Sequence, residues 1–128
     1  FIVMRYVPGR TLARILQEEG PQLPEQVLVW LKQIAKGLDY AHSKGVLHRD
    51  LKPSNLWLDD KWNRVLISDF GLAKAVQASG GSSVSQSQGE MTGTAYYMAP
   101  EVIRGRKQTA ASDLYSLGCV LYELLSGY

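Results

Sequence analysis

Two short apolar segments, separated by a turn and flanked by long helical patterns, constrain the fold more than any other feature of the sequence. Residues 56–58 and 65–67 have the composition of buried strands, and turn-forming residues dominate positions 59–63 between them. Together they predict a β-hairpin. A further short β-type segment is expected at residues 46–47. The expected fold class is therefore α+β, mainly helical with a small hairpin.

Apolar residues at helical spacing precede the hairpin. A short helix is expected after Thr11, a good N-cap residue, and should end at Gly20 and Pro21. A longer helix should begin near Pro24, which suits a first helical turn, and end at Gly45. Its apolar residues recur every three or four positions and should lie in the core: Val27, Trp30, Leu31, Ile34, Leu38 and Ala41.

Another helix is expected over residues 110–128, after a stretch of very different composition. Residues 78–89 are rich in Ser, Gly and Gln and should form a surface loop. The helix that follows should end at Gly127. Its leucines are expected to form one buried stripe: Leu114, Leu117, Leu121, Leu124 and Leu125.

Composition excludes several classes of protein. The formal net charge of the 128 residues is +2, too small to indicate nucleic-acid binding. Cys119 is the single cysteine, which excludes an internal disulfide framework and fits a reducing, cytoplasmic compartment. No apolar run is long enough for a membrane helix. Because the sequence opens inside a strand-like apolar run at residues 1–4, we expect a fragment of a larger domain, truncated at both ends.

Three clusters of polar and turn-forming residues do not fit a simple core. The first reads HRDLKPSN over residues 48–55, the second SDFG over residues 68–71, and the third GTAYYMAPE over residues 93–101. Each lies beside apolar segments that should be buried, where an ionisable group is costly unless it is paired or used. His48, next to Leu47, is best interpreted as a packed and hydrogen-bonded histidine.

Folding of the hairpin should bring together the side chains that flank it. Asp50 and Asn55 precede its first strand and Asp69 follows its second, so three oxygen donors suited to Mg²⁺ should converge. A Mg²⁺ ion held by few protein ligands leaves positions for substrate phosphates. Lys52 could place an ammonium group near such a phosphate. Phosphoryl transfer needs this combination of a carboxylate that orients a hydroxyl, metal ligands and a cation.

These clusters resemble the signature set of eukaryotic-type (Hanks-type) serine/threonine protein kinases. Residues 48–55 fit the catalytic-loop pattern, residues 69–71 the metal-binding triplet, and Ala99-Pro100-Glu101 the end of the activation segment. The resemblance implies a protein-kinase-like fold, with residues 1–7 as the end of the small lobe and hinge. Residues 8–128 would be the large lobe, through the helix that contains Asp113, which resembles the buried anchor of the catalytic loop.

The resemblance also implies roles for single residues. Asp50 would orient the substrate hydroxyl, Lys52 would contact the γ-phosphate of ATP, and Asn55 and Asp69 would hold Mg²⁺. Thr94 would position a Ser or Thr substrate. Residues expected around the nucleotide are Met4, Arg5, Val7, Thr11 and Trp57. Met4 and Val7 could equally be strand core, and Thr11 fits a helix cap better than a ribose contact.

The implied function is transfer of the γ-phosphate of ATP to Ser or Thr hydroxyls of protein substrates by the full-length parent. The fragment alone is expected to be inactive, because positioning supplies much of the rate. Trp57 stands where the family generally has an aliphatic residue under adenine, and a pseudokinase-like binding or scaffold module is the alternative. A small-molecule kinase is disfavoured by Thr94 and the closing motif. Arg49 could pair with a phosphorylated residue of the Ser-rich loop at residues 78–89.

Overall fold

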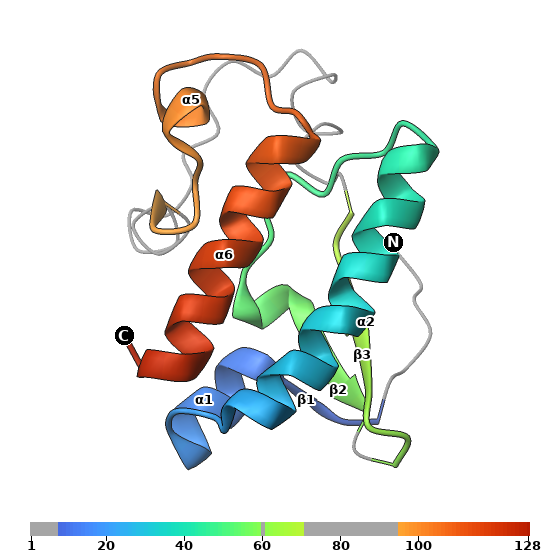
Figure 1. The fold of residues 1–128 in the computed structure, drawn as a ribbon, viewed down its shortest axis with the longest axis vertical. Helices are drawn as coiled ribbons and strands as arrows, with labels where there is room; N and C mark the ends of the chain where they lie inside the picture. The colour runs from blue at the N-terminus through green and yellow to red at the C-terminus, as the bar shows by residue number, and fades with distance from the viewer. Residues whose placement is uncertain (1–7, 60, 71–94) are drawn as a thin grey trace, which may run out of the picture.

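The computed structural model describes residues 8–59, 61–70 and 95–128 (Figure 1). The predictions for Met4, Arg5, Val7, Thr94 and the Ser-rich stretch at 78–89 concern residues outside these ranges. In chain order the described elements are β1 Arg10–Thr11, α1 Leu12–Glu19, α2 Pro24–Ser43, the 3₁₀ turn η1 Pro53–Asn55, β2 Leu56–Asp59, β3 Arg64–Ile67, α5 Pro100–Ile103 and α6 Ala110–Ser126.

The first two helices begin and end where the sequence predicts. Thr11 caps α1, because its Oγ1 accepts a hydrogen bond from the backbone N–H of Arg14 at 3.2 Å, and Gly20 is the C-cap. Pro24 occupies the first turn of α2. The helix stops one residue before Lys44, and Gly45 then adopts a φ of 72°, a left-handed conformation that glycine tolerates.

The predicted hairpin is confirmed, and it belongs to a three-stranded antiparallel sheet with the order β1-β2-β3. Leu56 pairs with Ile67, and Asp59 with Arg64. The third strand, β1, was not predicted, and it pairs Thr11 with Trp57. The expected β segment at residues 46–47 is wrong. The chain there leaves α2, and the N–H of residue 46 bonds to a carbonyl of that helix.

The buried face of α6 differs from the predicted leucine stripe. Leu117 and Leu124 are buried as expected, but Leu114 and Leu125 are 55% and 45% exposed. The buried positions along the helix are Ser112, Asp113, Leu117, Val120 and Leu124, and from Asp113 onward they are three or four residues apart. The prediction failed because it counted only apolar residues, whereas a buried carboxylate begins the inward-facing stripe.

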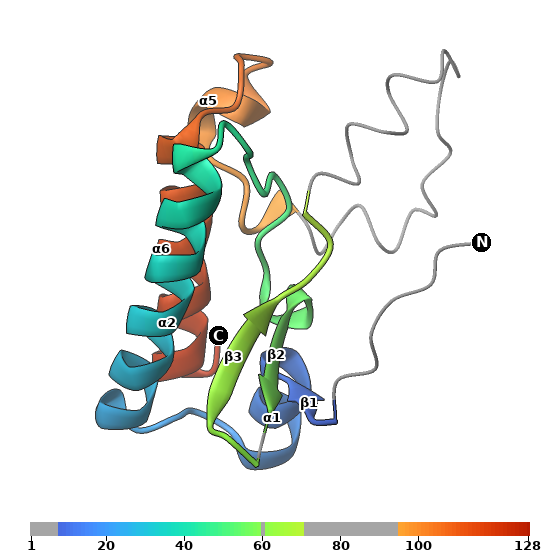
Figure 2. The ribbon, with the colours of Figure 1, turned by 90° about the vertical axis from the view of Figure 1, so that its right-hand side faces the viewer.

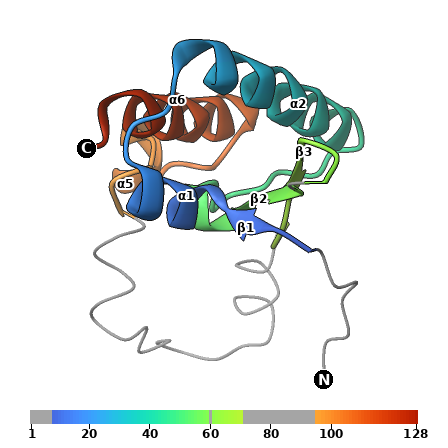
Figure 3. The same cartoon turned by 90° about the horizontal axis from the view of Figure 1, so that it is seen from below.

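Two layers enclose the core. Helices α2 and α6 pack side by side in one layer, and α1 and the sheet form the other (Figures 2 and 3). The buried residues between them come from every long element: Leu12, Ile15, Val27, Trp30, Ile34, Leu38, Leu51, Leu56, Leu58, Val65, Leu117, Val120 and Leu124. The layers approach closely at Gly37 of α2, where a Cβ atom would lie 3.0 Å from Cδ1 of Ile67. Among the described residues, no helix has the length and apolarity needed to cross a membrane.

Candidate active site

The buried carboxylate of Asp113, at the start of α6, fixes the backbone of the first cluster. Its Oδ2 accepts the backbone N–H of His48 at 2.9 Å, and its Oδ1 accepts that of Arg49 at 2.9 Å. Oδ2 also lies 2.8 Å from Nε2 of His42, near the end of α2. Asp113 is 2% exposed, and a buried carboxylate needs such partners. These bonds hold Arg49 at a φ of 73°, which a non-glycine residue rarely adopts.

His48 connects this loop to the end of β3. The side chain is 1% exposed, and its Nε2 lies 2.8 Å from the carbonyl oxygen of Ser68. Its Nδ1 accepts the backbone N–H of Asp50 at 3.3 Å. A ring that accepts at Nδ1 and faces a carbonyl at Nε2 carries its single proton on Nε2. The ring also makes an edge contact with Phe70. The prediction of a packed, hydrogen-bonded histidine is confirmed.

Asn55 closes the loop that begins at Asp50. Its Nδ2 donates to the backbone carbonyl of Asp50 at 2.7 Å and to Oδ2 of the same residue at 3.3 Å. The backbone carbonyl of Asn55 accepts the N–H of Ser68 at 2.9 Å. The register that pairs Leu56 with Ile67 explains this second contact, because it places the residues just outside the hairpin next to one another.

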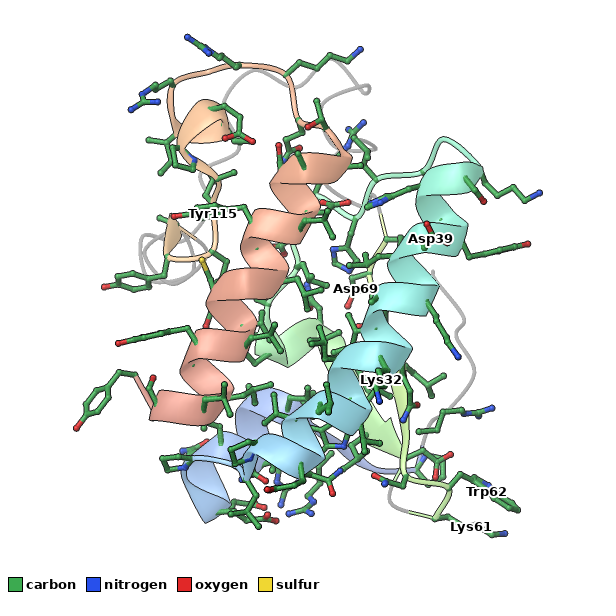
Figure 4. The ribbon with its side chains drawn as sticks, in the orientation of Figure 1. Lys32, Asp39, Lys61, Trp62, Asp69 and Tyr115 are labelled. Carbon is green, nitrogen blue, oxygen red and sulfur yellow. The ribbon has the colours of Figure 1, made fainter. Side chains whose placement is uncertain are left out.

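Asp69 follows Ser68 in the chain, and the two side chains are joined by a hydrogen bond. The hydroxyl of Ser68 donates to Oδ2 of Asp69 at 2.8 Å, and Asp69 has a φ of 63°. Figure 4 shows Asp69 at one end of the hairpin and Lys61 and Trp62 at the other. A continuous series of hydrogen bonds therefore runs from Asp50 through Asn55 and Ser68 to Asp69.

Lys52 adds a positive charge to this series. Its Nζ lies 3.0 Å from Oδ2 of Asp50, and the two side chains are 25% and 33% exposed. The two oppositely charged groups are therefore paired and still partly open to solvent.

The donor set fits a hard divalent cation. Because Nδ2 of Asn55 is used toward Asp50, its Oδ1 is the atom suited to a cation, and Asp69 adds a carboxylate. Within the described part of the chain, no three His, Cys, Asp or Glu side chains cluster as a metal site. Asn55 and Asp69 are therefore the candidate protein ligands for a divalent cation, whose other positions phosphate oxygens would fill.

The segment after residue 94 is also fastened to α6. Oγ of Ser116 donates to the carbonyl of Tyr97 at 2.7 Å, and the hydroxyl of Tyr97 donates to Glu123. Burial first, and this bond second, raise the pKa of Tyr97 above its ordinary value. The carboxylate of Glu101 accepts from Oγ of Ser112 at 2.8 Å. Its own backbone N–H and Ser112 lower the pKa of Glu101, with smaller contributions from Arg106 and Arg104.

Comparison with known proteins identifies the family. The sequence-family model of the protein kinase domain matches residues 1–128 of this chain. The chain is 44% identical over 127 residues to the serine/threonine-protein kinases PknB of Mycobacterium tuberculosis and Mycolicibacterium smegmatis, covering 99% of this chain and 20% of each relative. It is 42% identical to a probable serine/threonine-protein kinase PknB of Bifidobacterium longum, covering 99% of this chain and 18% of that protein.

The chain belongs to the protein kinase domain family. It spans about a fifth of the length of these relatives. The resemblance inferred from the three clusters and the kinase-like α+β fold class are thereby confirmed. Members of this family generally use ATP and a divalent metal ion.

Of the residues predicted to surround a nucleotide, the structure describes Thr11 and Trp57, which pair with each other across β1 and β2. Thr11 serves as the cap of α1, so its hydroxyl is engaged with the N–H of Arg14. Trp57 is partly exposed on the central strand. Their roles toward a nucleotide stay predictions.

Sequence reasoning missed two residues that organise this candidate site. Ser68 bonds to Asn55 and Asp69 and accepts from His48, and His42 supports the anchoring carboxylate. Ser68 stands inside the second cluster, which is a usable signal. His42 offers only its place at the end of an amphipathic helix, and no motif draws attention to it.

Proposed function

We propose that the protein containing this chain is an ATP-dependent kinase that phosphorylates Ser or Thr residues of protein substrates. The observation that carries the proposal is the hydrogen-bonded series Asp50–Asn55–Ser68–Asp69, with Lys52 paired to Asp50. Membership of the protein kinase domain family and the curated names of its relatives support it. The proposal concerns the full-length protein.

The chemistry divides among these side chains. Magnesium-bound ATP supplies an electrophilic γ-phosphoryl group, which Asn55 and Asp69 would hold through the cation. The carboxylate of Asp50 orients the acceptor hydroxyl and receives its proton, while the amide of Asn55 keeps that carboxylate in place. The ammonium group of Lys52 offsets negative charge that develops on the transferred group.

Substrate positioning would fall to the segment that follows. A cavity beside Asp50 is walled by Tyr97, Met98 and Ala99, together with Gln108. Because Tyr97 is fastened to α6 by its carbonyl and its hydroxyl, this wall has a defined position relative to Asp50. The cavity holds only about 10 Å³, the space of one water molecule, so we propose that the acceptor residue of the protein substrate approaches Asp50 alongside this wall, with Thr94 contributing as the family resemblance implies.

The test is transfer of ³²P from the γ-position of ATP to a Ser/Thr peptide by the full-length protein with Mg²⁺. Asp50→Asn should lower kcat by about 10²-fold or more, as loss of a general base does. Asp39→Asn, the same chemical change at an exposed position of α2, is the matched control and should leave transfer unchanged. Equal activity of the Asp50→Asn variant and the unmodified protein would contradict the proposal.

The scaffold alternative rests on Trp57 and makes a different forecast. A binding module would show no transfer with any peptide, and Asp50→Asn would change nothing measurable. Binding of Mg-ATP by the unmodified protein, measured by calorimetry, separates a kinase without its substrate from a module that holds no nucleotide.

A further inference from the structure

The loop between α5 and α6 concentrates positive charge. Residues 104–107 read Arg-Gly-Arg-Lys, so three of the chain's 14 Lys and Arg residues stand within four positions. All four of these residues are exposed. Arg and Lys side chains on a short loop form a compact patch suited to carboxylates or phosphates.

The backbone of this loop is held in place at both ends. The N–H of Arg104 bonds to the carbonyl of Pro100 at 3.1 Å, and that of Arg106 bonds to the carbonyl of Glu101 at 2.9 Å. Gly105 has a φ of 75°, which turns the chain between the two arginines. At the other end, Thr109 forms a capping box with Ser112 at the start of α6. A loop fixed in this way loses little entropy when it binds a partner.

The charges of this loop are not consumed by ion pairs. Some cations elsewhere in the chain are paired: Arg10 lies 2.7 Å from Glu19, and Arg14 lies 2.7 Å from Glu18. No ion pair joins Arg104, Arg106 or Lys107 to a carboxylate among the residues that the structure describes. The pKa of Glu101 is lowered first by its own backbone N–H and by Ser112, to which its carboxylate is bonded, and less by the charges of Arg106 and Arg104. One carboxylate leaves two of the three positive charges uncompensated.

The loop adjoins the candidate active site. Nε2 of Gln108 donates to the carbonyl of Arg49 at 3.2 Å, so the residue after Lys107 touches the residue before Asp50. Gln108 and Asp50 also line the same cavity. A peptide that presents a hydroxyl to Asp50 would therefore pass near the positive loop, and Arg49 adds a further cation beside it.

We propose that Arg104, Arg106 and Lys107 bind an acidic segment of the protein substrate and thereby select substrates with Asp or Glu residues near the acceptor. This inference rests on the proposed function for the identity of its partner. The loop steers the acidic segment by charge, and the two guanidinium groups fix it by paired hydrogen bonds to carboxylates. Asp50 and its network perform the transfer, and the loop changes only which protein reaches them.

Direct binding tests the loop without relying on catalysis. The probe is a fluorescein-labelled peptide with several Glu residues around a Ser, titrated with the full-length protein while anisotropy is recorded. Replacing all three cations by Ala should weaken binding at least tenfold. The matched control, Lys32→Ala with Lys36→Ala and Arg64→Ala, removes the same charge from other exposed positions and should change binding less than twofold. Equal losses in both triple variants would overturn the proposal.

Two further arms make the result specific. Arg104→Lys with Arg106→Lys keeps the charge but loses paired hydrogen bonding, and should give intermediate affinity. A peptide with Gln in place of Glu should bind weakly to every variant. Tighter binding of a single-stranded oligonucleotide, lost in the same Ala triple, would overturn the proposal in favour of a nucleic-acid site.

Kinetics separate this inference from the proposed function. With the Glu-containing peptide, the Ala triple should raise KM at least tenfold and leave kcat unchanged. With the Gln-containing peptide, both constants should match those of the unmodified protein. Normal transfer with no preference for Glu would refute the docking loop alone, whereas absence of transfer in every variant would refute the proposed function.

Discussion

The candidate catalytic loop, residues 48–55, and the segment of residues 95–103 are both attached to α6, but by different chemistry. The loop is held by one buried carboxylate, that of Asp113, which accepts hydrogen bonds from two backbone N–H groups and contacts His42. The later segment is tied by hydroxyl groups at half-buried positions, including those of Tyr97 and Ser116. A buried charge with three partners tolerates almost no change, whereas a hydroxyl contact near solvent can be replaced by water. We therefore expect the loop at residues 48–55 to be rigid and the attachment of residues 95–103 to tolerate substitution.

The largest effect should follow from Asp113→Asn. The Nδ2 group of Asn would face an N–H donor where Asp113 presents an oxygen, so a buried donor loses its acceptor. Loss of bonds to a buried charged group costs about 3 kcal/mol. We expect a clearly lower thermal midpoint of the full-length protein and loss of ³²P transfer. Asp39→Asn is the control; if both variants melted together, the contrast between the two attachments would fail.

Ser112→Ala should have a smaller effect and concern the later segment. The hydroxyl of Ser112 donates to Glu101 and accepts the N–H of Thr109 in the capping box of α6. Its removal should cost about 1 kcal/mol in stability, as loss of a helix cap does. Thermal unfolding of the full-length protein measures it. Ser54→Ala, at an exposed position of η1, controls for loss of a serine hydroxyl that has no such bonds.

Tyr97→Phe adds a dependence on pH. The raised pKa of Tyr97 means that the folded protein keeps the phenolic proton where the unfolded chain loses it. Its contribution to stability, about 1 kcal/mol for a bond to a carboxylate, is therefore present below about pH 10 and lost as pH rises further. The stability difference between the unmodified protein and the Phe variant should shrink above that pH. A constant difference across the alkaline range would exclude titration of this group as the cause.

Trp57→Leu, outside both regions, should have the smallest effect. Because Trp57 is partly exposed on β2, Leu should keep the strand and leave both attachments to α6 intact. We expect Mg-ATP affinity of the full-length protein to stay the same or to tighten, as calorimetry would show. A loss of more than tenfold would instead indicate that the indole stacks on the base.

The parts of the fold that follow from local pattern were predictable. Helix α1 between Thr11 and Gly20, helix α2 from Pro24, and the hairpin of β2 and β3 each carry their own start, stop and spacing signals. Strand β1 carries none, because two residues become a strand only when β2 lies beside them. Pairing between distant segments has no local signature.

The candidate site shows the same limit. Side chains with distinctive chemistry, such as Asp50, Asn55 and Asp69, were identified from the sequence, although their catalytic roles stay predictions. The contacts that join them use the backbone carbonyls of Asn55 and Ser68, which every residue possesses. The exposed leucines of α6 were misassigned for a related reason: Asp113 is buried because the loop backbone satisfies it, which only the assembled structure reveals.

The close approach at Gly37 has a consequence for the whole site. Helix α2 carries His42 and so supports the anchor from one layer, while β3 leads into Ser68 in the other. The absence of a methyl group at position 37 lets those layers approach closely, since an added Cβ would lie 3.0 Å from Cδ1 of Ile67. Ala at this position would force the far end of the Ile67 side chain to move by a few tenths of an ångström, so the packing of that side chain, and not the strand backbone, would take up the first displacement between the layers that carry His42 and Ser68.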